Sequence, residues 1–190
     1  MHERKQASQP EGILHTLLSI IVLVALVLGL TWGLRTFIFQ AYEIPSGSME
    51  TTIMPGDMVL SEKITYYGRP PAAGDIVTFE DPDPEHMGRI LIKRVIATGG
   101  QTVDLRDGRV YVDDVLQNEP YTHGEPSLAL RSYLFEEITY PYTVPPGGLW
   151  VMGDNRTNSQ DSRYFGAIPE SSVTGKALFI YWPLTDIGLL

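Results

Sequence analysis

The sequence predicts a mostly β domain that follows a single membrane-spanning helix. Three observations lead to this prediction: one long apolar run near the N-terminus, short β-rich segments after it, and turn residues between those segments. No sustained helical periodicity follows the apolar run. We therefore expect a β-barrel or β-sandwich with a smaller β-rich subdomain over about residues 100–145.

The apolar run extends from Ile13 to Leu34 and contains no Asp, Glu, Lys or Arg. A helix of this length spans about 33 Å, which is enough to cross the hydrocarbon core of a bilayer. A cleaved signal peptide has a shorter apolar core of about 7–15 residues, so we expect an uncleaved signal anchor over residues 13–36. A buried core helix is the alternative, and the length and all-round apolar character of the run disfavour it.

The orientation of this helix rests on few charges. Arg4 and Lys5 precede the run and Arg35 follows it, so the positive-inside rule gives modest support for a cytoplasmic N-terminus. We expect residues 1–12 to form a cytoplasmic tail and residues 37–190 to form an extracytoplasmic domain. The expected location is the plasma membrane, with the lipid bilayer as a partner.

Composition excludes several functional classes. The 14 Lys and Arg against 23 Asp and Glu give a net charge of −9, without a cluster of basic residues. Nucleic-acid binding needs such a cluster, so we expect no nucleic-acid partner. The absence of cysteine excludes disulfides, a thiolate nucleophile and cysteine-ligated metals. A chain of 190 residues has room for one domain of ordinary size.

Apolar segments rich in β-branched and aromatic residues predict core strands, and the turn residues between these segments mark where each strand ends. An Asp107-Gly108 turn between two alternating segments predicts a hairpin over residues 102–112. The acidic, proline-rich segment 81–86 is expected to be a solvated turn without function. The expected core strands are residues 59–60, 76–79, 90–96 and 177–182.

Three segments of the expected β domain carry side chains that are able to do chemistry. They are residues 45–49, Lys93-Arg94 and residues 153–163. Taken alone, Ser48 has the surroundings of a linker serine, and Lys93 those of a strand-end lysine that extends its amine to water. The third segment is too polar for a core strand, and a tight, internally hydrogen-bonded loop is its structural interpretation.

Taken together, the three segments resemble type I signal peptidases, membrane-bound Ser–Lys proteases that remove signal peptides from exported proteins. Residues 45–49 are similar to the nucleophile box of that family, residues 92–95 to its general-base box and residues 153–163 to its last conserved box. Thr51 and Thr157 stand where the family often has Pro and Asp. Neither position carries the reaction, so these departures concern local loop geometry.

The resemblance implies a role for each polar residue at the site. Ser48 is the implied nucleophile and Lys93 the implied general base, with the hydroxyl of Ser159 orienting the lysine. Ser46 and the backbone N–H of Ser48 are implied to form the oxyanion hole.

The resemblance also implies neighbours of the site. Two structural ion pairs are implied, although ordinary surface pairs remain the alternative. They join Arg94 to Asp154 and Asp161 to Arg163. Apolar residues are expected to form shallow pockets that favour small side chains, which is consistent with the family's preference for Ala at −1 and −3. These pocket residues are Ile44, Pro45, Leu91 and Ile92.

Lys93 can accept a proton only when its amine is neutral, and the reference pKa of lysine is about 10.4. Apolar residues flank Lys93 on both sides, so burial is expected to lower its pKa by about 2–3 units. His86 and His123 are the rival bases, and a Ser-His-Asp triad is the corresponding alternative. No metal or other cofactor is required.

The predicted protein is a single-pass membrane serine endopeptidase, expected to be monomeric, that cleaves preprotein signal peptides on the trans side. Ser48 lies nine residues after Phe39, so an extended chain keeps it within about 30 Å of the bilayer. A self-cleaving repressor also uses a Ser–Lys pair but would lack the anchor. An anchored peptide-binding domain and an inactive paralogue are the non-enzymatic alternatives, and the presence of both Ser48 and Lys93 disfavours the paralogue.

Overall fold

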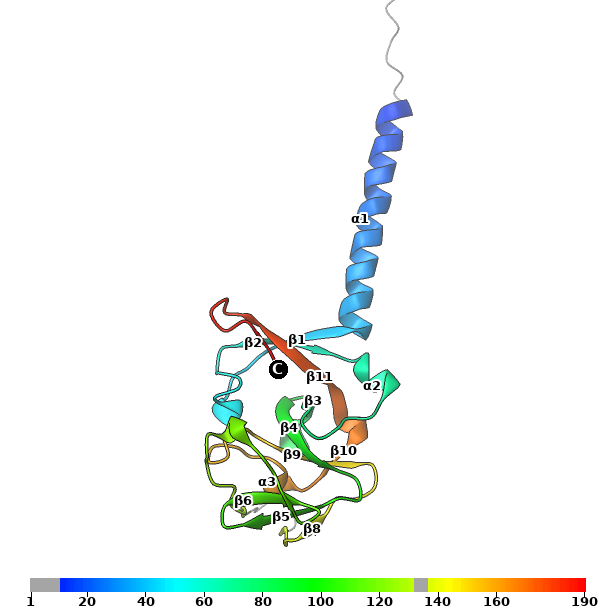
Figure 1. Cartoon of the computed structure of the whole chain (residues 1–190). Coiled ribbons are helices and arrows are strands. Elements are labelled where there is room, and N and C mark those ends of the chain that lie inside the picture. The colour runs from blue at the N-terminus through cyan, green and yellow to red at the C-terminus, as the bar shows by residue number, and fades with distance from the viewer. Residues whose placement is uncertain (1–10, 132–136) are drawn as a thin grey trace, which may run out of the picture. The chain divides into compact units, whose positions relative to one another are not determined.

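The computed structural model describes residues 11–131 and 137–190, and the chain divides into a unit that ends at Ile38 and a β unit over Phe39–Leu190. Helix α1 comprises Glu11–Phe37, slightly more than the expected span (Figure 1). It is the one helix in these ranges that is long and apolar enough to cross a membrane. Thr16 and Ser19 donate to carbonyl oxygens one turn back, so their hydroxyls stay paired in an apolar solvent.

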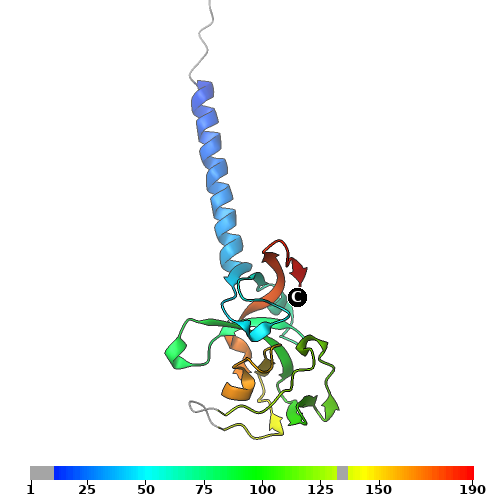
Figure 2. The same ribbon diagram turned by 90° about the vertical axis from the view of Figure 1, so that its left-hand side faces the viewer.

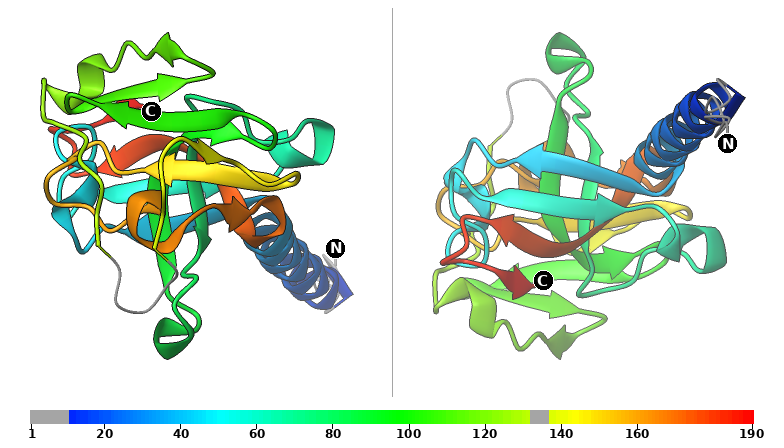
Figure 3. Two further views of the ribbon diagram at one scale, coloured as in Figure 1. Left: turned by 90° about the horizontal axis from the view of Figure 1, so that it is seen from below. Right: turned by 90° about the horizontal axis from the view of Figure 1, so that it is seen from above.

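The β unit is built on a curled antiparallel sheet of eight strands, which Figures 1 and 3 show. The strand order is β1-β2-β11-β3-β4-β9-β10, and β12 pairs with β11. Register shifts within β4 and β11 bend these strands, which is how a sheet curls. The strands are β1 (Phe39–Glu43), β2 (Met58–Glu62), β3 (Ile76–Glu80), β4 (Ile90–Thr98), β9 (Gly148–Met152), β10 (Ile168–Pro169), β11 (Val173–Trp182) and β12 (Gly188–Leu189).

A second sheet of four strands has the order β7-β6-β5-β8. The hairpin between β5 and β6 is confirmed, with Asp107 and Gly108 at φ values of 51° and 75° as a two-residue turn requires. The strands are β5 (Thr102–Arg106), β6 (Arg109–Val112), β7 (Val115–Leu116) and β8 (Tyr142–Thr143).

Short helical turns connect the strands, and Figure 2 shows several of them around the rim of the sheet. Two of them belong to the polar segments singled out above: one contains Ser48 and the other follows Asp161. The turns are η1 (Gly47–Met49), α2 (Thr65–Gly68), η2 (Pro84–His86), η3 (Pro120–Thr122), α3 (Ser162–Phe165) and η4 (Glu170–Ser172).

The mostly β fold is confirmed, and the two sheets share a core. Trp150 of β9 is fully buried and packs in one cluster with Val103 and Val110 of the small sheet. The rings of Tyr140 and Tyr142 lie 6.0 and 4.8 Å from the Trp150 ring. Burial of this shared apolar surface fixes the small sheet against β4 and β9, and so fixes the segments between its strands relative to the polar loops.

Candidate active site

Ser48 lies in η1, which begins four residues after the end of the edge strand β1, and its side chain is buried with 8% of the residue exposed. The turn is anchored because Met49 and Ile53 pack in a core cluster with Ile44 and Ile92. Both anchors have no exposed surface. The apolar residues on either side of Ser48 therefore fix the position of its hydroxyl relative to β4.

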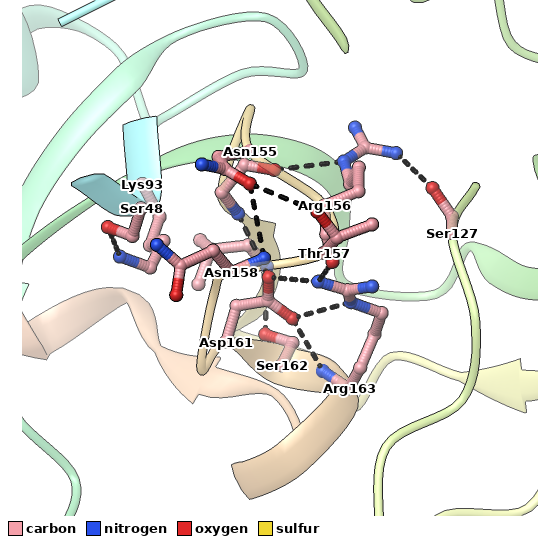
Figure 4. Close-up of polar contacts among 12 residues, drawn as sticks. Ser48, Lys93, Ser127, Asn155, Arg156, Thr157, Asn158, Asp161, Ser162 and Arg163 are labelled. Atoms are coloured by element: carbon pink, nitrogen blue, oxygen red, sulfur yellow. Dashed lines mark hydrogen bonds and ion pairs between the residues drawn. The ribbon is translucent and has the colours of Figure 1, made fainter. Parts of the chain in front are cut away.

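Lys93 reaches this hydroxyl from β4. Its Nζ donates to Ser48 Oγ at 2.6 Å and to the carbonyl oxygen of Ile92 at 2.9 Å (Figure 4). Because adjacent residues of a strand point to opposite faces, Lys93 contacts Ser48 while Arg94 contacts Asp154. The structure thus brings together two side chains that are 45 residues apart in the sequence.

Burial lowers the pKa of Lys93 to about 8, because transfer out of water disfavours the charged amine. The carboxylates of Asp161 and Asp154 oppose this effect, and Arg89 adds to it. The direction agrees with the expectation from the apolar sequence around Lys93. At pH 8 about half of the Lys93 amines are neutral and able to accept a proton.

The polar segment 153–163 packs directly behind Ser48 as an ordered loop. The Asn155 N–H donates to the Ser48 carbonyl oxygen at 3.2 Å, and its side-chain amide donates to the Gly47 carbonyl oxygen at 3.0 Å. A Cβ on Gly153 would collide with the Ser48 carbonyl oxygen and with Ser159 Oγ. Glycine is therefore required at position 153 for the loop to approach the nucleophile.

Both implied ion pairs are present; Asp161, Arg163 and Asp154 are buried, and the Arg94 side chain is 13% exposed. Asp161 accepts from Arg163 Nε and Nη2 at 2.9 Å each and from the Gly153 N–H at 3.0 Å. Burial would raise the pKa of Asp161, but the hydrogen bonds and the charge of Arg163 lower it below its usual value. Arg94 binds Asp154 through two hydrogen bonds of 2.7 and 2.8 Å. Paired charges of this kind hold loop geometry more than they add net stability.

The other two serines lie close to the pair but are not hydrogen-bonded to it. Ser46 is exposed beside Ser48, and its hydroxyl does not cap η1. Ser159 is buried against Gly153. Among the described residues the hydrogen bonds of Lys93 Nζ go to Ser48 and Ile92, so no hydrogen bond joins Ser159 to the amine.

A cleft of about 320 Å³ opens beside the Ser48–Lys93 pair. The four apolar residues expected to form substrate pockets, together with Ser46, line it. Strand β4 pairs with β9 only from Arg94 onward, so within residues 11–131 and 137–190 the edge of residues 90–93 opposite β3 has no strand partner and lies along the cleft. Asn158 and Gln160 of the polar segment also line the cleft, and the lining residues that sequence reasoning did not find are Tyr42, Glu43, Thr78, Asp81, Asp83, Arg89, Ile90, Tyr164 and Phe165.

The expectation for segment 81–86 is wrong in one respect. Asp81 lines the cleft, its side chain is only 3% exposed, and it accepts from Arg89 Nε at 2.6 Å. Asp81 is therefore a buried residue of the cleft wall and not a solvated turn residue. Tyr164 and Phe165 were also missed, although their position directly after Arg163 of the third polar segment was a usable signal.

The rival histidines lie elsewhere. His86 hydrogen-bonds to Asp83 at 2.9 Å, and His123 Nε2 hydrogen-bonds to Thr51 Oγ1 at 2.5 Å. In the described part of the chain, Ser48 Oγ accepts its hydrogen bond from Lys93 Nζ and not from a histidine. A serine hydroxyl on a partly neutral lysine amine, beside an open cleft in a β domain, is the arrangement of serine hydrolases that use a lysine base.

Comparison with known proteins places the chain within this class. The family described as "Signal peptidase, peptidase S26" matches residues 15–182. A probable signal peptidase I-1 of Synechocystis is 39% identical over 175 residues, covering 90% of this chain and 84% of that protein. Thylakoidal processing peptidase 1 of Arabidopsis thaliana is 37% identical over 162 residues, covering 81% of this chain and 45% of that protein. A crystal structure of a signal peptidase I from Enterococcus faecalis is 33% identical, covers 56% of this chain and 95% of that chain, and superposes with a TM-score of 0.44.

The chain belongs to the signal peptidase family, peptidase S26. It is a serine endopeptidase, its substrates are preprotein signal peptides, and one N-terminal helix anchors it to a membrane.

Proposed function

We propose that this signal peptidase cleaves its substrates with Ser48 as the nucleophile and Lys93 as the general base. The observation that carries the proposal is the buried 2.6 Å hydrogen bond between Lys93 Nζ and Ser48 Oγ. The lysine pKa of about 8 supports it, because a neutral amine accepts the hydroxyl proton.

The reaction proceeds through an acyl-enzyme. Ser48 Oγ attacks the scissile carbonyl carbon while its proton passes to Lys93 Nζ, which forms a tetrahedral intermediate. The C–N bond then breaks, and the Lys93 ammonium returns the proton to the leaving amine. Lys93 then takes a proton from a water molecule that attacks the ester carbonyl carbon, and as the ester C–O bond breaks the Lys93 ammonium returns the proton to Ser48 Oγ. The Ser46 hydroxyl and the Ser48 backbone N–H stabilise the oxyanion. Within the described ranges Ser159 Oγ makes no hydrogen bond to Lys93, so its role in orienting the lysine requires a hydrogen bond to Lys93 that forms during the cycle.

The substrate lies extended in the cleft along the unpaired edge of residues 90–93 in β4. An extended peptide that pairs with a free strand edge gains main-chain hydrogen bonds, and its alternate side chains enter pockets. Ile44, Pro45, Leu91 and Ile92 line this cleft, where we expect them to form shallow pockets. Their shape favours small side chains such as Ala at −1 and −3.

The helix is oriented with its N-terminus in the cytoplasm, and the monomeric β unit works on the trans side of the plasma membrane. Arg4 and Lys5 before α1 support this orientation. The match to a thylakoidal relative makes the thylakoid the second candidate membrane. Fractionation of the source cell distinguishes the two.

The test is cleavage of a preprotein with an Ala-x-Ala site by the full chain in detergent. Ser48→Ala should fold normally and lose at least about 10³-fold in kcat/KM, because it removes the nucleophile. The matched control is Ser171→Ala, an exposed serine of η4, which should keep full activity. Turnover by Ser48→Ala within tenfold of wild type contradicts the assignment.

A further inference from the structure

We propose that residues 119–127 form a positioning clamp, hereafter the clamp segment, that holds the active-site segments in register. Tyr121 of this segment and Arg156 of the polar loop are its positioning residues. The inference rests on the proposed function, since it concerns how Ser48 and Lys93 are aligned. Three sets of contacts support it.

The first set ties the clamp segment to the loop behind the nucleophile. Arg156 is only 1% exposed, and its guanidinium binds both carboxylate oxygens of Glu119 at 2.6 and 2.9 Å. It also donates to Ser127 Oγ at 2.6 Å and to the Gly153 carbonyl oxygen at 2.9 Å (Figure 4). Because Gly153 packs against the Ser48 carbonyl, this bidentate pair fixes the backbone on which the nucleophile rests.

The second set reaches the strand of the general base. The Tyr121 hydroxyl donates to Glu119 Oε1 at 3.0 Å, so the same carboxylate serves both sets of contacts. The Arg94 guanidinium lies 4.0 Å from the centre of the Tyr121 ring, which is close enough for a cation–π interaction. Arg94 directly follows Lys93 and binds Asp154, so the ring fixes β4 at the residue next to the base.

The third set reaches the nucleophile turn and the polar loop. His123 hydrogen-bonds to the hydroxyl of Thr51 at 2.5 Å, three residues after Ser48. Glu125 accepts from the Thr157 N–H at 3.3 Å. The clamp segment thus contacts all three of the segments that carry Ser48, Lys93 and Ser159. A displacement of about 1 Å between reacting groups lowers a rate by about 10²-fold, so this common support controls kcat.

The test compares two tyrosines that each lie under an arginine. Tyr121→Ala removes the clamp ring. The control is Tyr111→Ala, because Tyr111 lies under Arg106 at 4.7 Å in the small sheet, outside the clamp segment. With preprotein substrate, at least 15 °C below each melting temperature, Tyr121→Ala should lower kcat at least tenfold with KM within threefold. Tyr121→Phe, which keeps the ring, should stay within threefold of wild type, and Tyr111→Ala within twofold.

A second readout does not depend on turnover. Hydrogen exchange of the Asn155 amide, which donates to the Ser48 carbonyl, should accelerate at least tenfold in Tyr121→Ala and stay unchanged in Tyr111→Ala. If Tyr121→Ala fails to fold, Arg156→Lys, which keeps the charge but loses the bidentate pair, should show the same changes. Unchanged exchange, an unchanged kcat or an equal loss in Tyr111→Ala overturns the clamp. An inactive wild-type chain would contradict the proposed function instead, and the exchange comparison would still test the clamp.

Discussion

Replacing Lys93 with Met should remove a specific pH dependence of stability. Burial lowers the lysine pKa from 10.5 to about 8, and 2.5 units at about 1.36 kcal/mol each amount to about 3 kcal/mol. Between pH 8 and 10.5 the unfolded chain still holds the proton that the folded chain has lost, so the unfolding free energy of the wild type rises with pH in this window. Lys93→Met has no such group. The amount by which its unfolding free energy exceeds that of the wild type should therefore fall by about 3 kcal/mol across the window.

At pH 7, the unfolding free energy of Lys93→Met should exceed that of the wild type by less than about 3 kcal/mol. Met fills a similar volume, but the variant loses the hydrogen bonds from Nζ to Ser48 and Ile92, each of which contributes about 1 kcal/mol. Urea unfolding of the full chain in detergent micelles, at intervals from pH 7 to 10.5, measures both proteins, and the other titrating groups cancel in the difference. A difference that stays constant within about 0.5 kcal/mol over this range would refute the reasoning.

Three further predictions follow from the site and the anchor. Gly153→Ala should abolish cleavage and lower the unfolding free energy by about 1–3 kcal/mol, because its Cβ would collide with the Ser48 carbonyl oxygen; normal activity would show that the loop does not press on the nucleophile. Exchanging Ala for Phe at −1 of the preprotein should lower kcat/KM at least about 10²-fold, since overfilling a shallow pocket displaces the scissile carbonyl; equal rates would point to another class of site. Protease added to the trans side of intact membranes should digest residues 37–190 and spare residues 1–12, whereas a protected domain would reverse the orientation.

Local sequence patterns predicted four strands of the large sheet and one hairpin, but not β1 or β9, although β9 is an apolar run whose five residues are all buried. Strands β2, β3, β4 and β11 are apolar and β-branched, and the hairpin of β5 and β6 has a turn that accepts positive φ. The two-residue strands β7, β8, β10 and β12 were not predicted. Pairing with a partner distant in the sequence defines them, and two residues are too few for a period to show.

The site was predicted only as far as its motifs extend. The pairing of Ser48 with Lys93 came from resemblance to a family and from the chemistry of a buried amine. Asp81 lies in the connection between the paired strands β3 and β4, and this pairing brings it to the cleft. The acidic, proline-rich sequence of the connection does not indicate that position. Glu119 and Tyr121 lie about 30 residues from the polar loop and belong to no recognisable pattern, so only tertiary packing reveals their contacts with Arg156 and Arg94.

The pH profile of cleavage tests most directly whether Lys93 is the proton acceptor. With the pKa of Lys93 lowered to about 8, kcat/KM should rise about tenfold per pH unit below pH 8 and level off above it, because only the neutral amine accepts the Ser48 proton. Lys93→Arg should fold and show no turnover at any pH, since a guanidinium stays charged. The account would be contradicted if kcat/KM rose with an apparent pKa near 6.5, which is typical of histidine, and if the Lys93→Arg enzyme were active. His86 and His123 would then be the candidate bases.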